Sequence, residues 1–152
     1  MQIRKAERAD LPGLVAIEDL SFSEPWSHAS MASAVENPDI YTAVSLEGGT
    51  VTGYVILALM GIEAEIYNVA VHPDARRQGL GAALLQNALK KAEQEGAETV
   101  FLEVRASNEP AKALYLGHGF VPVGLRKKYY TNPTEDAILM ACTVERDGDE
   151  RT

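Results

Sequence analysis

The chain has 152 residues, of which 46% are hydrophobic and 24% are charged, with a formal net charge of −8 and a pI of about 4.9. This length and composition are typical of one globular domain with a sizeable core. The acidic balance argues against a nucleic-acid-binding surface, which is usually basic, and is compatible with a cationic partner. We therefore expect no direct contact with nucleic acid.

Several other classes of protein are also excluded by the sequence. The single cysteine, Cys142, cannot form an intrachain disulfide, and the three histidines show no metal-ligand spacing. The polar N-terminus has no signal-peptide pattern, and no apolar run reaches the length of a membrane span. We therefore expect a cytoplasmic protein with no metal and no membrane contact. Its expected organisation is one domain over residues 1–146 and a polar tail over residues 147–152.

The first half of the chain predicts one short strand, then helices, then a run of strands. Asp10 can cap the first helix and Ser27 the second, and Gly48-Gly49 is typical of a hairpin turn. The expected elements are a strand at Ile3–Ala6, helices at Ala9–Leu20 and Ser27–Val35, and strands at Ile40–Leu46, Val51–Leu59 and Glu65–His72.

The second half predicts alternating helices and strands. A helix from Gly79 to Gln94 has one apolar face at a spacing of about 3.6 residues, and Gly96 ends it. The later expected elements are a strand at Thr99–Arg105, a helix at Asn108–His118, and strands at Phe120–Arg126 and Ala137–Glu145 around a polar loop. This order predicts an α/β fold in which helices cover both faces of a mixed sheet.

The segment Val69 to Leu85 leads from an apolar strand through a His-Pro turn into a basic, glycine-bearing loop that opens a helix. A helix N-terminus presents unpaired N–H groups and the positive end of the helix dipole. Gly79 and Gly81 let an anion approach the backbone closely, while Arg76 and Arg77 add positive charge. The pattern predicts a phosphate or pyrophosphate site.

A dinucleotide site is the strongest competing interpretation of this loop, because Gly79-Leu80-Gly81 opens a helix. That fingerprint, however, needs Gly or Ala where this chain has Leu84. The glycines also lie in the middle of the chain, with no mononucleotide-binding repeat before them. We reject a dinucleotide site on these grounds.

Glu103 lies within Val100–Val104, an otherwise apolar strand that we expect to be buried on both faces. A carboxylate there is costly unless it is paired, so it is either a general base or part of an ion pair, for example with Arg105 on the same strand face. In the next helix, Asn108 and Tyr115 share one stripe. Taken singly, Asn108 is typical of a helix cap and Tyr115 of a core residue.

Together these segments resemble the GNAT superfamily, the GCN5-related N-acetyltransferases. Arg76, Gly79 and Gly81 match its acetyl-CoA motif, and the segment Leu102 to Phe120 matches its second motif. The resemblance is closer still to the ribosomal-protein-alanine N-acetyltransferase family, and it extends over residues 4–144. The segments that add to it are Pro25-Trp26-Ser27, Arg126 to Tyr130 and Glu135 to Met140. The resemblance implies a single-domain GNAT fold with a central, mostly antiparallel sheet.

The resemblance also implies residue roles. Glu103 would be the general base for the incoming ammonium, Tyr115 would protonate the departing CoA thiolate, and the Val71 N–H would polarise the thioester carbonyl. The residues implied to bind acetyl-CoA are Val69, Ala70 and Val71 for the pantetheine arm, Arg77, Gln78, Gly79, Leu80, Gly81 and Ala82 for the pyrophosphate, and Asn108. Trp26, Tyr129 and Tyr130 would line the peptide entrance, with the two tyrosines in a loop that grips the peptide.

The implied reaction is acetyl transfer from acetyl-CoA to the N-terminal alanine α-amine of a small-subunit ribosomal protein. Two alternatives stay open from the sequence. One is acetylation of a different amine, such as another protein N-terminus, a lysine side chain or a small molecule. The other is a non-catalytic module that only binds acetyl-CoA.

Overall fold

A seven-stranded sheet runs through the molecule in the order β1-β2-β3-β4-β5-β7-β6. In this computed structural model, which describes residues 1–144, all neighbouring strands are antiparallel except β4 and β5, which are parallel. The strands are β1 (Gln2–Lys5), β2 (Ile40–Glu47), β3 (Thr50–Met60), β4 (Glu63–Val71), β5 (Thr99–Arg105), β6 (Val121–Tyr130) and β7 (Glu135–Thr143). The expected tail, residues 147–152, and Glu145 of the last expected strand lie outside the described residues.

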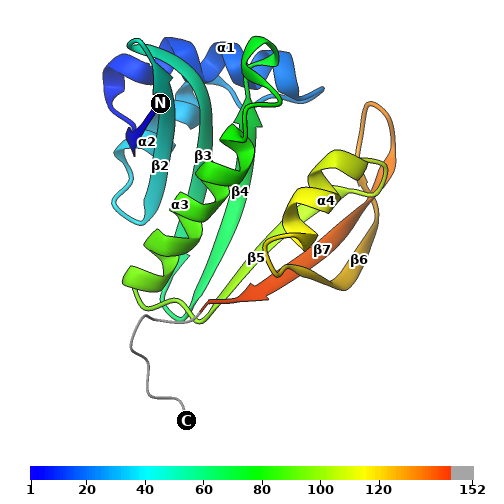
Figure 1. Cartoon of the computed structure of the whole chain (residues 1–152). Helices are drawn as coiled ribbons and strands as arrows, with labels where there is room; N and C mark the ends of the chain where they lie inside the picture. The colour runs from blue at the N-terminus through cyan, green and yellow to red at the C-terminus, as the bar shows by residue number, and fades with distance from the viewer. Residues whose placement is uncertain (145–152) are drawn as a thin grey trace.

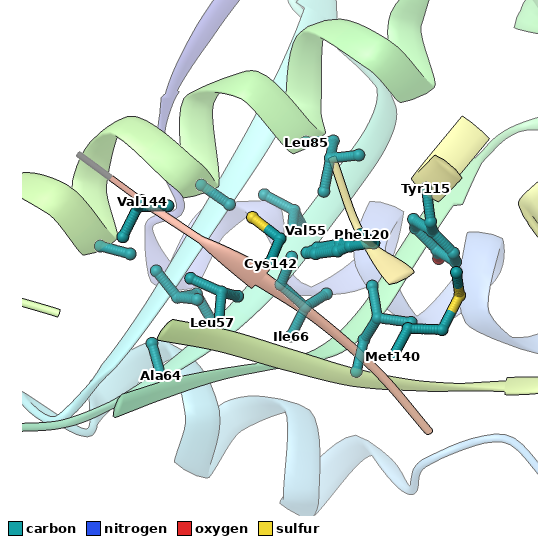
Figure 2. Packing of buried hydrophobic residues seen from close by; sticks show 14 of the residues in the cluster. Val55, Leu57, Ala64, Ile66, Leu85, Tyr115, Phe120, Met140, Cys142 and Val144 are labelled. Atoms are coloured by element: carbon teal, nitrogen blue, oxygen red, sulfur yellow. The ribbon is translucent and has the colours of Figure 1, made fainter. Parts of the chain in front are cut away.

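Helices cover both faces of this sheet, as the sequence predicts (Figure 1). They are α1 (Leu11–Ser21), α2 (His28–Glu36), α3 (Leu80–Gln94) and α4 (Glu109–Leu116), with 3-10 turns at Arg8–Asp10 and Pro73–Ala75. The apolar sides of α1 and α2 form one core with Tyr54 and Ile56 of β3. The apolar sides of α3 and α4 form the other core with Val55 and Leu57, where the Tyr115 ring lies near Phe120 and Met140 (Figure 2). The expected mixed, mostly antiparallel fold is confirmed.

The start of α1 differs from the prediction. Asp10 does not cap α1 with its side chain, because Asp10 itself lies in a 3-10 turn that precedes the helix. Its carboxylate instead accepts the Glu7 N–H at 2.7 Å and pairs with Arg4 at 2.8 Å. Ser27 does cap α2, accepting the Ser30 N–H at 3.1 Å.

The environment of β5 also differs from the prediction of a strand buried on both faces. Its side chains alternate, with Val100, Leu102 and Val104 buried against α3 and α4 while Phe101, Glu103 and Arg105 are only half-buried. The reason is that α1 and α2 contact β2, β3 and β4 and stop short of the β5-β7-β6 half of the sheet. The second face of this half, called the open face below, therefore remains accessible.

The two parallel strands separate after a short paired stretch. The β4–β5 ladder runs only from Glu63 opposite Thr99 to Ile66 opposite Leu102. The next residue of β4, Tyr67, has no partner on β3 because the register shifts there, which is the mark of a β-bulge. Figure 1 shows the two strands together at one end of the sheet and apart at the other.

Gly53 of β3 tests how closely the sheet packs on α3. A Cβ at this position would lie 2.9 Å from the Ala70 carbonyl oxygen and 2.9 Å from Leu84 Cδ1. We predict that Gly53→Ala lowers the free energy of unfolding by about 1–3 kcal/mol, the usual range for overpacking, as measured by urea denaturation. Gly124→Ala is the control, because its Cβ would meet only Leu139 at 3.6 Å. Equal midpoints for the two variants would contradict the predicted crowding.

Candidate active site

The glycine-bearing loop opens α3 with an exposed backbone. Gly79 is the residue before the helix and has φ 75°, and Arg77 also lies in the left-handed region with φ 65°. A Cβ at Gly79 would meet no atom within 4 Å, and one at Gly81 would meet only Leu114 at 3.5 Å. The unpaired N–H groups of the first helical turn are thus reachable by an anion, and the arginines beside them are exposed. This arrangement fits the pyrophosphate of acetyl-CoA.

The end of β4 points backbone groups into the space where β5 has diverged. His72 donates its N–H to the Thr52 carbonyl of the β3 side at 2.8 Å. Since successive residues of a strand direct their N–H groups to alternate sides, Val71 and Val69 direct theirs away from β3. On that side, Arg76 Nε donates to the Val71 carbonyl at 3.3 Å, which ties the glycine-bearing loop to this strand end.

Glu103 is held on the open face by an arginine from another strand. Its Oε1 lies 3.3 Å from Arg126 Nε of β6, and its side chain is 15% exposed. Its Oε2 is buried and has no hydrogen-bond partner among the described residues. The alternative ion pair of Glu103 with Arg105 is wrong, because Arg105 pairs with Glu135 at 3.3 Å. One carboxylate oxygen of Glu103 therefore has an unused acceptor site, which neighbouring atoms cover in this structure.

Arg105 joins three segments around the open face. It donates to the Thr131 carbonyl at 2.8 Å, to the Pro133 carbonyl at 3.0 Å and to Ser23 Oγ at 3.1 Å. Its guanidinium also lies 4.5 Å from the centre of the Tyr130 ring. A single side chain thus connects β5 with the β6–β7 loop and with the connection between α1 and α2. The sequence offered Arg105 only as a partner for Glu103, since these contacts are distant along the chain.

Tyr115 lies on the opposite side of β5, in the core formed with α3. It is 8% exposed and packs edge-on against Phe120 with ring centres 5.8 Å apart. Burial raises the pKa of its phenol to about 12. The hydroxyl therefore keeps its proton throughout the neutral range and can serve as a proton donor.

The two tyrosines of the expected peptide entrance are placed differently from the prediction. Tyr129 and Tyr130 end β6 and do not lie in a loop, because β6 continues to Tyr130 after a shift of register beyond Arg126. Tyr129 is 52% exposed, and its pKa is raised by the charge of Glu103 first and then by burial. Burial, then the charge of Glu103, raises the pKa of Tyr130 to about 12.

Tyr130 lies within electrostatic range of both expected catalytic residues. Glu103 and Tyr115 both raise the pKa of Tyr130, although they lie on opposite faces of β5. The Tyr130 ring also packs against the ring of Tyr129, with ring centres 5.1 Å apart. Trp26 borders the same face from the other side, with its ring 5.9 Å from the ring of Tyr67 at the bulge.

Asn108 has the structural role that its type and position favour. Its side-chain oxygen accepts the Ala111 N–H at 3.2 Å and so caps α4. The cap orients the helix that carries Tyr115.

Sequence reasoning missed Glu18, a carboxylate that is 1% exposed. It accepts hydrogen bonds from the Tyr54 hydroxyl, from Asn68 Nδ2 at 3.0 Å and from the Trp26 N–H at 2.9 Å. The charge of Glu18 adds to burial in raising the pKa of Tyr54. A Glu on the apolar stripe of the first helix was the available signal, since Glu is rarely buried without partners.

Neither a membrane-spanning helix nor a metal site occurs in the part of the chain that the structure describes. No helix there is long and apolar enough to cross a membrane. Within residues 1–144, no group of three or more His, Cys, Asp or Glu side chains is arranged to hold a metal ion.

The fold and the site define an acetyltransferase of the GNAT class. The model of the Acetyltransferase (GNAT) family matches residues 11–120, and the chain belongs to this family. Both short motifs of the sequence, at the glycine-bearing loop and around Glu103, lie within that range. GNAT acetyltransferases use acetyl-CoA, which agrees with the open loop before α3.

Individual proteins and solved structures are also similar to this chain over most of its length. The [ribosomal protein bS18]-alanine N-acetyltransferase of Escherichia coli is 39% identical over 145 residues, covering 93% of this chain and 97% of the relative. The crystal structure of the E. coli ribosomal-protein-S18-alanine N-acetyltransferase has a TM-score of 0.89 at 37% identity and covers 99% of this chain and 98% of its own. A Salmonella typhimurium structure with its cofactor acetyl-CoA has a TM-score of 0.84 at 20% identity, covering 100% of this chain and 98% of its own, and shows the shared fold.

Arg105 gives a testable prediction for the walls of the site. We expect Arg105→Met to speed hydrogen exchange of the backbone amides in residues 131–135 by about tenfold or more, because hydrogen bonds from a charged donor are each worth about 1.5–3 kcal/mol. Hydrogen exchange followed by mass spectrometry measures this. Lys112→Met, which removes only an ion pair with Glu109 on α4, serves as the control. Unchanged exchange in residues 131–135 would show that Arg105 does not hold this loop.

Proposed function

We propose that this protein transfers the acetyl group of acetyl-CoA to the α-amine of the N-terminal alanine of ribosomal protein bS18. The observation that carries the proposal is the Glu103 carboxylate, fixed on one oxygen by Arg126 and free on the other, beside the divergence of β4 and β5. The acceptor class is supported by the 39% identity to the E. coli enzyme named for this reaction. Such an acceptor implies a cytoplasmic site of action.

Acetyl-CoA supplies an activated acetyl thioester, and the chain offers backbone groups to hold it. The N–H groups between Arg77 and Ala82, at the start of α3, would bind the pyrophosphate. The backbone of Val69 to Val71 faces the divergence and would pair with the pantetheine arm, and Asn108 would add a contact. The Val71 N–H, which points away from β3, would polarise the thioester carbonyl as a one-donor oxyanion hole.

Glu103 would act as the general base. An α-amine is mostly protonated near neutral pH and attacks a thioester only when it is neutral. Glu103 would accept the ammonium proton on its free oxygen, directly or through a water molecule. Arg126, bound to the other oxygen at 3.3 Å, orients the carboxylate.

Tyr115 would act as the general acid on the other side of β5. Its phenol, with a pKa of about 12, remains protonated at every pH at which the acceptor is used, so it can donate to the departing thiolate. A thiolate is a moderately good leaving group, and this donation therefore contributes less than the base. Trp26, Tyr129 and Tyr130 would line the entrance for the first residues of the acceptor peptide.

Mass spectrometry of purified protein with acetyl-CoA tests the acceptor. One peptide copies the mature N-terminus of bS18, and a second has the same sequence with its α-amine blocked. We expect acetylation of the free-amine peptide alone, on its first residue. Acetylation of the blocked peptide on lysine would identify a lysine acetyltransferase. Binding of acetyl-CoA without any product would favour a small-molecule acceptor or a non-catalytic module.

The division of roles predicts unequal losses in two variants. At neutral pH we expect Glu103→Gln to lower kcat by about 10²–10⁴-fold, the usual worth of a general base, and Tyr115→Phe to lower it less. Initial rates at saturating acetyl-CoA measure both. The KM for acetyl-CoA should stay near the wild-type value in Glu103→Gln, which controls for folding. Equal losses, or a larger loss in Tyr115→Phe, would count against this assignment.

A further inference from the structure

A second carboxylate lies close to Glu103 on the open face. Glu65 of β4 is paired in register with Phe101 of β5, and side chains at paired positions of a sheet point to the same face. Glu103 is two residues further along β5 and therefore shares this face as well. The neighbouring Ile66 is buried in the core beneath α3, which confirms that Glu65 points the other way. Glu65 thus lies one residue before the end of the paired stretch, beyond which β4 and β5 separate.

Two carboxylates on this face are each paired with an arginine, whereas Glu65 is not. Arg126 bonds to Glu103 at 3.3 Å, and Arg105 bonds to Glu135 at 3.3 Å. Among the described residues, Glu65 forms no hydrogen bond or ion pair of its own. The pKa of Glu65 is raised by burial first and then by the charge of Glu103, with Arg126 acting in the opposite direction, so these three groups sense one another.

We propose that Glu65 is a specificity-determining residue that supplies unpaired negative charge beside the general base, with which this enzyme draws a protonated amine onto the open face. The proposal rests on the proposed acetyltransferase function and deepens it. Because Arg126 neutralises Glu103, the general base alone offers little net attraction to a cation. Glu65 offers that attraction from the adjoining strand, at the position where an acceptor would pass toward the divergence. Its contribution is to acceptor binding, and proton transfer remains with Glu103.

Kinetics of Glu65→Gln separate these roles. We expect the KM for the acceptor to rise about three- to tenfold, as for loss of one partly screened charge interaction, while kcat stays within about twofold of wild type. The KM for acetyl-CoA should not change, because the loop before α3 and Tyr115 lie on the opposite face of the sheet from Glu65. The KM increase should shrink between about 0.02 M and about 0.3 M salt, as the Debye length falls below the reach of the charge.

Glu63→Gln is the matched control. Glu63 lies two residues earlier on β4, so it points to the same face and its removal changes net charge equally. It is exposed and pairs in register with Thr99, two register pairs further from Glu103 than Glu65 is. We expect wild-type kinetics from this variant. An equal rise in KM for Glu63→Gln would show that the effect depends only on the net charge of the protein, and this would overturn the proposal.

The acceptor panel keeps this test separate from the test of the proposed function. The acceptors are the bS18 peptide, a peptide with only a lysine amine, and spermidine, and each variant is assayed with the acceptor that wild type uses. Failure of wild type on the bS18 peptide rejects the ribosomal acceptor and leaves the role of Glu65 to be judged on another amine. An unchanged acceptor KM in Glu65→Gln, or a fall in kcat with KM unchanged, overturns the role of Glu65. Absence of turnover with every acceptor overturns both.

Discussion

The separation of β4 and β5 is the constraint on which the site depends. Two parallel strands joined by a crossover helix would normally pair along their length, but here pairing stops at Ile66 and Leu102. A β-bulge at Tyr67 bends β4 at that point. The N–H groups of Val69 and Val71 then lack a neighbouring strand on the β5 side, and buried backbone donors need partners. The pantetheine arm of acetyl-CoA, which we propose binds here, would supply those partners by pairing with β4 as an additional strand would.

This separation also gives the site two faces with different chemistry. On the side of α3 and α4, the N-terminus of α3 and the buried Tyr115 present hydrogen-bond donors to an anionic molecule. On the open face, Arg126–Glu103 and Arg105–Glu135 form two ion pairs beside tyrosine rings. A donor entering from one face and an acceptor from the other would meet between the strands. Direct transfer needs this geometry, because the amine has to reach the thioester without a covalent enzyme intermediate.

The sequence was informative where local chemistry decides the structure. The glycine-bearing loop, the cap by Asn108 and the amphipathic α3 depend on residues close in the chain, and the structure forms the loop, the cap and the helix. The sequence was misleading where contacts between distant segments decide the structure. The apolar run around Glu103 suggested burial on both faces, yet α1 and α2 do not reach β5. The partner of Glu103 is Arg126, 23 positions away, and the bulge at Tyr67 leaves no composition signal.

The buried carboxylate of Glu18 connects the segment that carries Trp26 with strands β3 and β4. Burying a charge is unfavourable unless each of its oxygens finds donors, and here Tyr54, Asn68 and the Trp26 N–H supply them. Asn68 follows the bulge on β4, and Trp26 follows α1. One carboxylate therefore fixes the loop that carries Trp26 relative to the strand end whose backbone faces the divergence. An apolar residue at position 18 could fill the same core but could not specify that alignment, because dispersion contacts have little directional preference.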